Sequence, residues 1–184
     1  MQRIPLLVLV LIIQLLFLAQ LKANEAIWLY IDIEKLQLEV KQGNKTLAVM
    51  ENIAIGRSGA GFKQHIGDDI TPIGTYKIGW INKNSPFYRF YGFNYPSVKN
   101  AEQALSAGLL SQQAYTSIIK AHKKDETPPQ HTRIGGRIGI HGLGNADETI
   151  HKMMNWTHGC IALTNEQIDR LEPWIRENMR VKIK

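Results

Sequence analysis

The sequence contains only one cysteine, Cys160, in 184 residues. A chain with one cysteine cannot form an internal disulfide, nor can it supply the several cysteines of a typical structural zinc site. Such a thiol is a buried apolar side chain, half of an intermolecular disulfide, or a reactive group. The residues around it have to decide between these alternatives.

The chain also has no motif of interleaved aromatic and basic residues of the kind that binds nucleic acid, although its formal net charge is +6. A moderate basic excess fits an anionic polymer of the cell envelope as well as it fits nucleic acid. Because the motif is missing, we expect no nucleic acid partner.

The N-terminal apolar run, residues 6–19, is too short for a typical membrane span, which needs roughly 20 apolar residues. It suits the apolar region of a secretory signal. We therefore expect residues 1–23 to be a signal peptide or, because Leu21 occupies a position where cleavage sites prefer a small residue, an N-terminal anchor. No cysteine follows the run directly, which excludes a lipoprotein anchor. The protein is accordingly expected to be exported.

The remaining residues, 24–184, are enough for one domain with its own core. Alternating apolar residues of β-branched and aromatic types predict strands within 26–56, with a hairpin turn at residues 42–44. Residues 56–69 are glycine-rich and polar, which indicates a mobile loop, and the Thr-Pro-Ile-Gly sequence at 71–74 indicates a type I turn. Further strands are expected at 75–80, 137–142 and 179–184.

Residues 81–133 are predicted to be an insertion, with an irregular aromatic part followed by two short helices. Asn100 is expected to cap the first helix and Ser111 the second. Near the C-terminus, Thr164 and Gln167 form a capping box for a helix that Pro173 should kink or split. The predicted class is mainly β, with short helices and a helical insertion.

The chemistry of the lone thiol depends on its histidine neighbours. A free cysteine, with a pKa of about 8.5, is mostly protonated at neutral pH and needs a base or a positive charge nearby to act as a nucleophile. His158 lies two residues before it, and His141 ends a predicted strand. Since a histidine at a strand end is held rigidly, His141 is the favoured base. The backbone N–H groups of Gly159 and Cys160 could stabilise an oxyanion, which points to acyl transfer.

The pattern formed by these residues resembles the signature of the L,D-transpeptidases with a YkuD-type catalytic domain. His141 is followed by 15 intervening residues and then by Thr157, His158, Gly159 and Cys160. The segments "GDDITPIGTY" at 67–76 and "CIALTNEQI" at 160–168 are similar to other parts of the family pattern. The resemblance covers most of residues 27–183 and implies a YkuD-like β-sandwich.

The resemblance implies that Cys160 is the acylated nucleophile, that His141 is its base, and that the carbonyl of Gly142 orients the imidazole. The thiolate would attack the third residue of a peptidoglycan tetrapeptide stem and expel the terminal D-alanine. The acceptor of the acyl group could be an amine of another stem, a lipoprotein amine, or water. Peptidoglycan stem peptides are therefore the expected partners, carbapenems the expected acylating inhibitors, and the bacterial periplasm or cell envelope the expected location. No cofactor or metal is implied.

The same resemblance places His158 and Gly159 in an oxyanion loop that Thr157 supports. One departure concerns the second position after the cysteine, where many relatives have Arg or Asn and this chain has Ala162. The polar contact made there in relatives is missing, which bears on donor or acceptor recognition rather than on thiol chemistry.

Three alternatives remain open from the residues themselves. His141, His158 and Cys160 could bind zinc with water as a fourth ligand. The chain could also be a catalytically silent module that binds the cell wall, or a hydrolase that uses the same cysteine to trim stems or release a lipoprotein. The basic side chains at 120, 123 and 124 could hold anionic glycan, but such a run is more often solvated. The aromatic residues between 87 and 95 more often pack in a core than form a lid.

Overall fold

The computed structural model describes residues 25–184. The expected export segment, residues 1–23, lies outside the described part. Within residues 25–184, no helix is long and apolar enough to span a bilayer.

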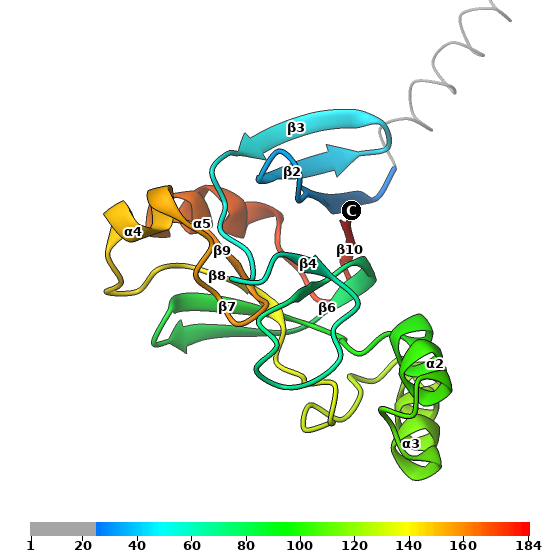
Figure 1. The fold of residues 1–184 in the computed structure, drawn as a ribbon. Helices are drawn as coiled ribbons and strands as arrows, with labels where there is room; N and C mark the ends of the chain where they lie inside the picture. Colours follow the sequence, from blue (N-terminus) through cyan, green and yellow to red (C-terminus); the bar gives the residue numbers. More distant parts are fainter. Residues whose placement is uncertain (1–24) are drawn as a thin grey trace, which may run out of the picture.

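Strands dominate the structure, as the sequence predicts (Figure 1). Eight of them form one mixed sheet in the order β3-β2-β1-β10-β6-β7-β8-β9, and two short strands form a second sheet. The bounds in the large sheet are β1 (Ile27–Asp32), β2 (Gln37–Gln42), β3 (Lys45–Met50), β6 (Gly74–Ser85), β7 (Tyr88–Phe93), β8 (Gly139–His141), β9 (Ile161–Ala162) and β10 (Arg180–Ile183). The small sheet pairs β4 (Ala60–Gly61) with β5 (Thr71–Pro72) in parallel.

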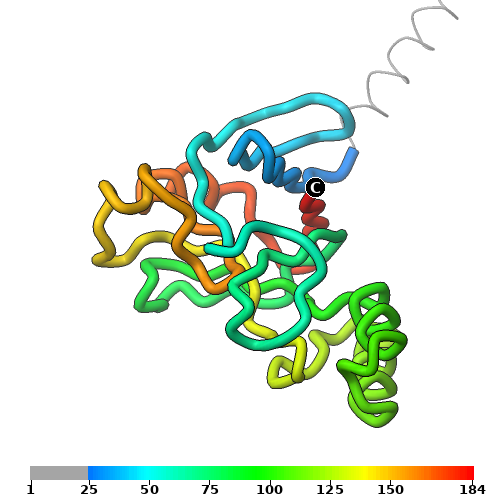
Figure 2. Tube along the Cα trace, viewed as in Figure 1, coloured from blue at the N-terminus to red at the C-terminus, as the bar shows by residue number. Residues whose placement is uncertain are grey.

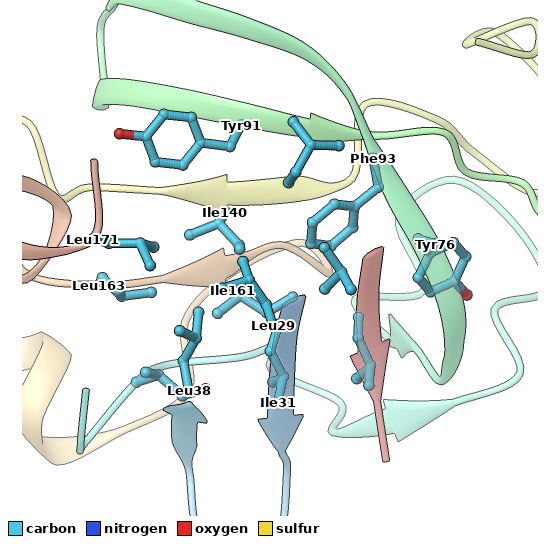
Figure 3. Close-up of a cluster of buried hydrophobic side chains, with 14 of the residues drawn as sticks. Leu29, Ile31, Leu38, Tyr76, Tyr91, Phe93, Ile140, Ile161, Leu163 and Leu171 are labelled. Carbon is cyan, nitrogen blue, oxygen red and sulfur yellow. The ribbon is translucent and has the colours of Figure 1, made fainter. Parts of the chain in front are cut away.

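The large sheet folds over a single apolar core because its longest strand, β6, belongs to both of its halves. The start of β6 pairs with β10, and its later part pairs with β7. Side chains from the two halves meet in the core, including Leu29 and Ile31 from β1 against Phe93 from β7 and Ile140 from β8 (Figure 3). All four are fully buried. Burying such a side chain stabilises the fold by about 1.5–3 kcal/mol, so the core fixes the two halves relative to each other.

The C-terminal part of the chain closes this arrangement as predicted. The capping box of Thr164 and Gln167 begins α5 (Asn165–Leu171). The helix then changes to a single 3-10 turn, η1 (Glu172–Trp174), at Pro173, and β10 follows. Parallel pairing of β10 with β1 brings the C-terminus beside the first described strand.

A pair of helices stands at one end of the molecule, at the lower right in Figures 1 and 2. They are α2 (Val98–Ser106) and α3 (Gln112–Lys123), and they share a small core of their own that includes Ala101, Ala104 and Ile118. Ser111 caps α3 as predicted. The prediction that Asn100 caps α2 is wrong, because Ser97 is the N-cap and Asn100, three residues later, completes the capping box from the helix side.

The segment predicted to be irregular and aromatic is mostly strand as far as Phe93, although the pairing of β6 with β7 contains register shifts. Residues 82–85 extend β6, and β7 forms a hairpin with it. Strand alternation explains the aromatic residues, since Tyr91 and Phe93 are buried in the core while Phe90 lies on the opposite face. The helical part of the expected insertion is confined to the segment that carries α2 and α3.

Two local predictions near the start of the domain also fail. The expected type I turn at 71–74 is extended chain, with β5 followed directly by β6, because Thr71 and Pro72 pair with β4. The strand expected to continue to residue 56 stops at Met50, and only isolated bridges such as Ala54 with Ala162 follow.

Candidate active site

The cysteine loop, residues 157–160, connects α4 (Glu148–Met153) and its following residues to β9. Gly159 has a φ of 122°, a conformation that side-chain-bearing residues rarely adopt. A Cβ atom at this position would lie 2.6 Å from the carbonyl oxygen of Ile70. Only glycine therefore fits between the loop and the segment beneath it, which fixes the backbone immediately before Cys160.

Thr157 closes the loop from inside with its hydroxyl group. Oγ1 donates to the carbonyl of Cys160 at 2.7 Å and accepts the backbone N–H of Gly159 at 3.1 Å. Thr157 is only 3% exposed, so water does not replace these bonds readily. The N–H of Gly159 already has this acceptor, and the expectation that it faces an oxyanion does not fit the geometry.

His141 ends β8 beside the loop, where its residue pairs with Ala162 of β9. Its Nδ1 lies 2.7 Å from the carbonyl oxygen of Gly142, which is the contact that the family resemblance implied. A carbonyl can only accept, so Nδ1 carries the proton and Nε2 keeps its lone pair. Burial lowers the pKa of His141, while the bond to Gly142 opposes this shift. The imidazole is therefore neutral at pH 7, with Nε2 able to accept a proton.

Aromatic rings surround this imidazole. The ring centroids of Phe87, Phe90 and Trp156 lie 4.7, 6.3 and 5.9 Å from that of His141. Trp156 is itself held by a 3.2 Å bond from its Nε1 to Nδ1 of His151. His151 is only 4% exposed and supports the site through this bond.

Cys160 is partly exposed and shares a cavity of about 750 Å³ with His141. Its thiol donates to the carbonyl of Arg137 at 3.5 Å. Between residues 25 and 184, no hydrogen bond joins this sulfur to the imidazole. Burial raises the pKa of the Cys160 thiol to about 11, against smaller lowering effects of the Gly139 N–H and the charge of Lys63. The resting site is thus a neutral thiol and a neutral imidazole.

His158 does not turn towards the thiol but lies at the rim of the cavity, with its side chain 76% exposed. Its Nδ1 contacts Oδ1 of Asp69 at 2.6 Å, and Arg57 binds the other oxygen of Asp69 at 2.9 Å. The bond to His158, supported by Arg57, lowers the pKa of Asp69. These contacts tie the loop to residues 57–69 from outside. No group of three or more potential metal ligands occurs in residues 25–184, so the zinc alternative lacks a site there.

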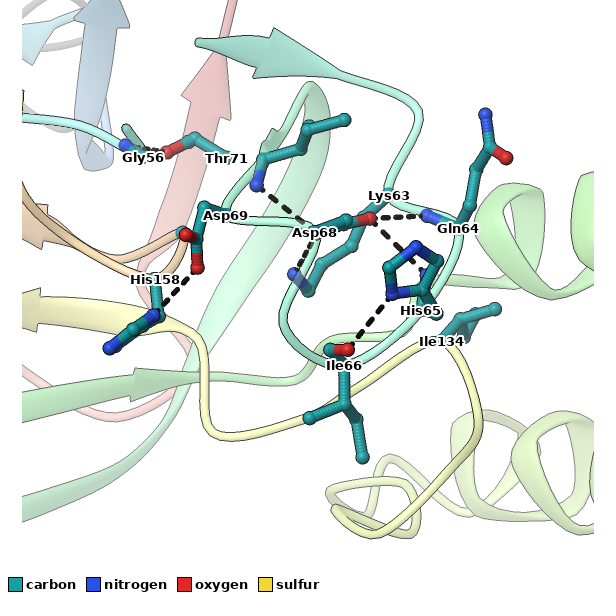
Figure 4. Close-up of polar contacts among 12 residues, drawn as sticks. Gly56, Lys63, Gln64, His65, Ile66, Asp68, Asp69, Thr71, Ile134 and His158 are labelled. Atoms are coloured by element: carbon teal, nitrogen blue, oxygen red, sulfur yellow. Dashed lines mark hydrogen bonds and ion pairs between the residues drawn. The ribbon is translucent and has the colours of Figure 1, made fainter. Parts of the chain in front are cut away.

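Sequence reasoning missed a buried ion pair under the loop, between Lys63 and Asp68 (Figure 4). Their side chains are 3% and 7% exposed. Asp68 also accepts the backbone N–H groups of Gln64, His65 and Ile70, and these bonds together with Lys63 keep its pKa low although burial raises it. Since Ile70 supports Gly159, the pair holds the platform of the cysteine loop. In the sequence, only the adjacent aspartates of "GDD" at 67–69 could have indicated a buried acidic group here.

Comparison with family profiles matches residues 26–183 to a known family. The matching family is YkuD, described as the L,D-transpeptidase catalytic domain. The chain belongs to this family. No curated protein sequence matched it.

Several solved structures are similar to this chain. Pgp2, the helical cell shape determining protein of Campylobacter jejuni, matches 88% of this chain and 48% of its own, at 20% identity and a TM-score of 0.58. Bd1075 of Bdellovibrio bacteriovorus matches the same shares at 17% identity and a TM-score of 0.53. The L,D-transpeptidase LdtMt1, solved in complex with imipenem, matches 87% and 59% at 12% identity and a TM-score of 0.46. The chain spans about half the length of the first two proteins.

Ala162 stands where many relatives have a polar residue, and it cannot make a polar side-chain contact. Ala162 is fully buried, and its backbone exchanges two hydrogen bonds with Ala54, at 3.0 and 2.8 Å. Its side chain contributes no charge or hydrogen bond to the cavity. Polar recognition of a substrate here has to come from other residues.

Proposed function

We propose that this protein is a peptidoglycan L,D-transpeptidase that uses Cys160 as nucleophile and His141 as base. One observation carries the proposal: Nδ1 of His141 is bound to Gly142, so Nε2 keeps its lone pair, and His141 and Cys160 line the same cavity. The membership of the YkuD family supports the reaction class.

In the acylation step, the thiol proton moves to Nε2 of His141 as the sulfur attacks the carbonyl of the third residue of a tetrapeptide stem. Because both groups are neutral at rest, proton transfer accompanies attack rather than preceding it. The tetrahedral intermediate then collapses as the imidazolium returns the proton to the amine of the departing D-alanine. The product is a thioester on Cys160.

We assign the oxyanion of this intermediate to the backbone N–H of Cys160, since the N–H of Gly159 donates to Thr157. Removing one such donor in other enzymes costs about 2.7–4 kcal/mol of transition-state stabilisation. Thr157, Gly159 and the platform below them hold this N–H in place. His158 contributes from outside the loop, through Asp69.

In the second step, an amine attacks the thioester, with His141 accepting its proton, and an amide forms as the thiol is regenerated. An amine of a neighbouring stem gives a cross-link, and a lipoprotein amine gives anchoring. Transfer to an amine is the reaction that we propose, on the strength of the family description. We place it in the cell envelope, where residues 1–23 would direct or anchor the protein. The fold shared with Pgp2 suits a role in wall remodelling that affects cell shape.

The test is an incubation of purified protein with a synthetic tetrapeptide donor and an amine acceptor, analysed by mass spectrometry. Transfer yields a cross-linked dimer together with free D-alanine, whereas tripeptide without dimer shows a hydrolase. Cys160→Ser and His141→Gln should abolish D-alanine release. His65→Gln, an exposed histidine outside the cavity, is the matched control and should behave as wild type. Imipenem should add to wild type but not to Cys160→Ser.

A further inference from the structure

Arg137 has a backbone conformation that needs support. Its φ is 54°, in the left-handed region that residues other than glycine seldom adopt. The side chain of Gln130 supports it, because Oε1 accepts the N–H of Arg137 at 2.7 Å while Nε2 donates to the carbonyl of Tyr95 at 2.7 Å. An unusual conformation that its surroundings enforce in this way is typical of functional positions.

Both the backbone carbonyl and the side chain of Arg137 lie at the candidate site. The carbonyl of Arg137 accepts the hydrogen bond of the Cys160 thiol, so this residue lies next to the reacting sulfur. Its side chain, which is exposed to solvent, lines the cavity that contains Cys160 and His141. Arg137 is therefore held beside the Cys160 sulfur through its backbone, and it lines the cavity that contains this sulfur.

The guanidinium of Arg137 contacts a histidine rather than a carboxylate in the described part of the chain: its Nη2 lies 3.2 Å from Nε2 of His131. No aspartate or glutamate of residues 25–184 forms an ion pair with it, in contrast to Arg57 and Arg89, which both bind carboxylates. The other residues that line the cavity are aromatic, small, amide or histidine side chains. Arg137 is thus the one permanently charged group among the described residues lining this cavity.

We propose that Arg137 binds a carboxylate of the donor stem, next to the amide that Cys160 attacks. The inference rests on the proposed function and assigns a substrate contact that Ala162 cannot make. A guanidinium binds carboxylates with two parallel hydrogen bonds, which orients as well as attracts the ligand. Two carboxylates of a stem lie near the attacked amide: that of the departing D-alanine, and the second carboxylate of the third residue where that residue is diaminopimelic acid.

The experiment compares three synthetic donors: the tetrapeptide, its analogue with the terminal D-alanine carboxylate amidated, and its analogue with the diaminopimelic acid carboxylate amidated. D-alanine or D-alaninamide release gives kcat/KM for each. The variants are Arg137→Gln and Arg137→Lys. Arg133→Gln, an exposed arginine of the same loop outside this cavity, is the matched control.

Wild type should prefer the native donor over one amidated analogue by about tenfold or more, mostly through KM. Arg137→Gln should lose that preference while it processes the amidated analogue as wild type does, and Arg137→Lys should keep part of it. Which analogue is discriminated identifies the carboxylate. An equal loss on all three donors, or no change on any, overturns the inference and leaves the proposed function standing. Wild type that releases nothing from any donor and forms no adduct on Cys160 overturns both.

Discussion

Replacing Thr157 by valine tests the internal clamp of the cysteine loop, because valine keeps the shape of threonine and removes only the hydroxyl. Two hydrogen bonds disappear, one to the carbonyl of Cys160 and one from the N–H of Gly159. Loss of the bond to Cys160 costs about 1 kcal/mol net, and the buried N–H of Gly159 left without an acceptor costs about 1–3 kcal/mol. Together these losses should lower the free energy of unfolding of Thr157→Val by about 2–4 kcal/mol. For a domain of this size the loss corresponds to a fall in Tm of about 4–16 °C.

The assays are thermal unfolding followed by circular dichroism and the rate of D-alanine release. Thr157→Ser retains the hydroxyl and should recover most of the stability and activity. Thr116→Val removes an exposed hydroxyl on α3 and should leave both within error. A Thr157→Val protein with the Tm and activity of wild type would refute the clamp.

Three further predictions concern charge. The pKa of about 11 for Cys160 means that iodoacetamide alkylation should rise about tenfold per pH unit from pH 7 to 9, and a plateau below pH 8 would show a preformed thiolate instead. Lys63→Met should destabilise the fold by about 3–5 kcal/mol in urea unfolding, because Asp68 is left buried and unpaired; the double variant with Asp68→Asn should recover much of this, and equal losses in both would contradict the ion-pair explanation. Burial lowers the pKa of His141 and of His151, so below pH 6.5 the unfolded chain binds more protons than the folded protein. The free energy of unfolding should therefore decrease as the pH is lowered. An unchanged free energy of unfolding between pH 7 and pH 5 would contradict this.

The parts of the site that are close in sequence could be predicted from sequence. The spacing from His141 to the cysteine loop predicts two candidate reactive groups, which the structure places in one cavity, and the local chemistry of Thr164, Gln167 and Pro173 located α5 and its end. These signals act over one turn of helix or one strand. They survive in a single sequence because their physical cause is local.

The errors arose where distant residues decide the local structure. The sequence predicted irregular structure where β6 and β7 form a hairpin, because this pairing depends on a sheet that strands from distant parts of the chain build together. Strand β7 needs glycine at position 92, because a Cβ there would lie 2.1 Å from the ring of Trp80 on the paired strand. Ser97 and Asn100 are both good cap residues. In the capping box at the start of α2, Ser97 is the N-cap and the side chain of Asn100 bonds back to the backbone of Ser97.

The supporting residues of the site were hidden for the same reason. Lys63 and Arg137 reach the cysteine loop through contacts between segments that are far apart in the chain, and neither lies in a recognisable motif. The neutral state of the thiol also follows from tertiary burial. The sequence predicts His141 and Cys160 as the reacting pair, whereas the burial that lowers the pKa of His141 and raises that of Cys160 depends on the fold.

The most direct test of the account is the intact mass of the protein after brief reaction with the tetrapeptide donor, followed by peptide mapping. We expect an adduct on Cys160 with the mass of the donor minus D-alanine, joined as a thioester and released by hydroxylamine. The account is contradicted if the donor is consumed without an adduct on Cys160, or if Cys160→Ala still releases D-alanine.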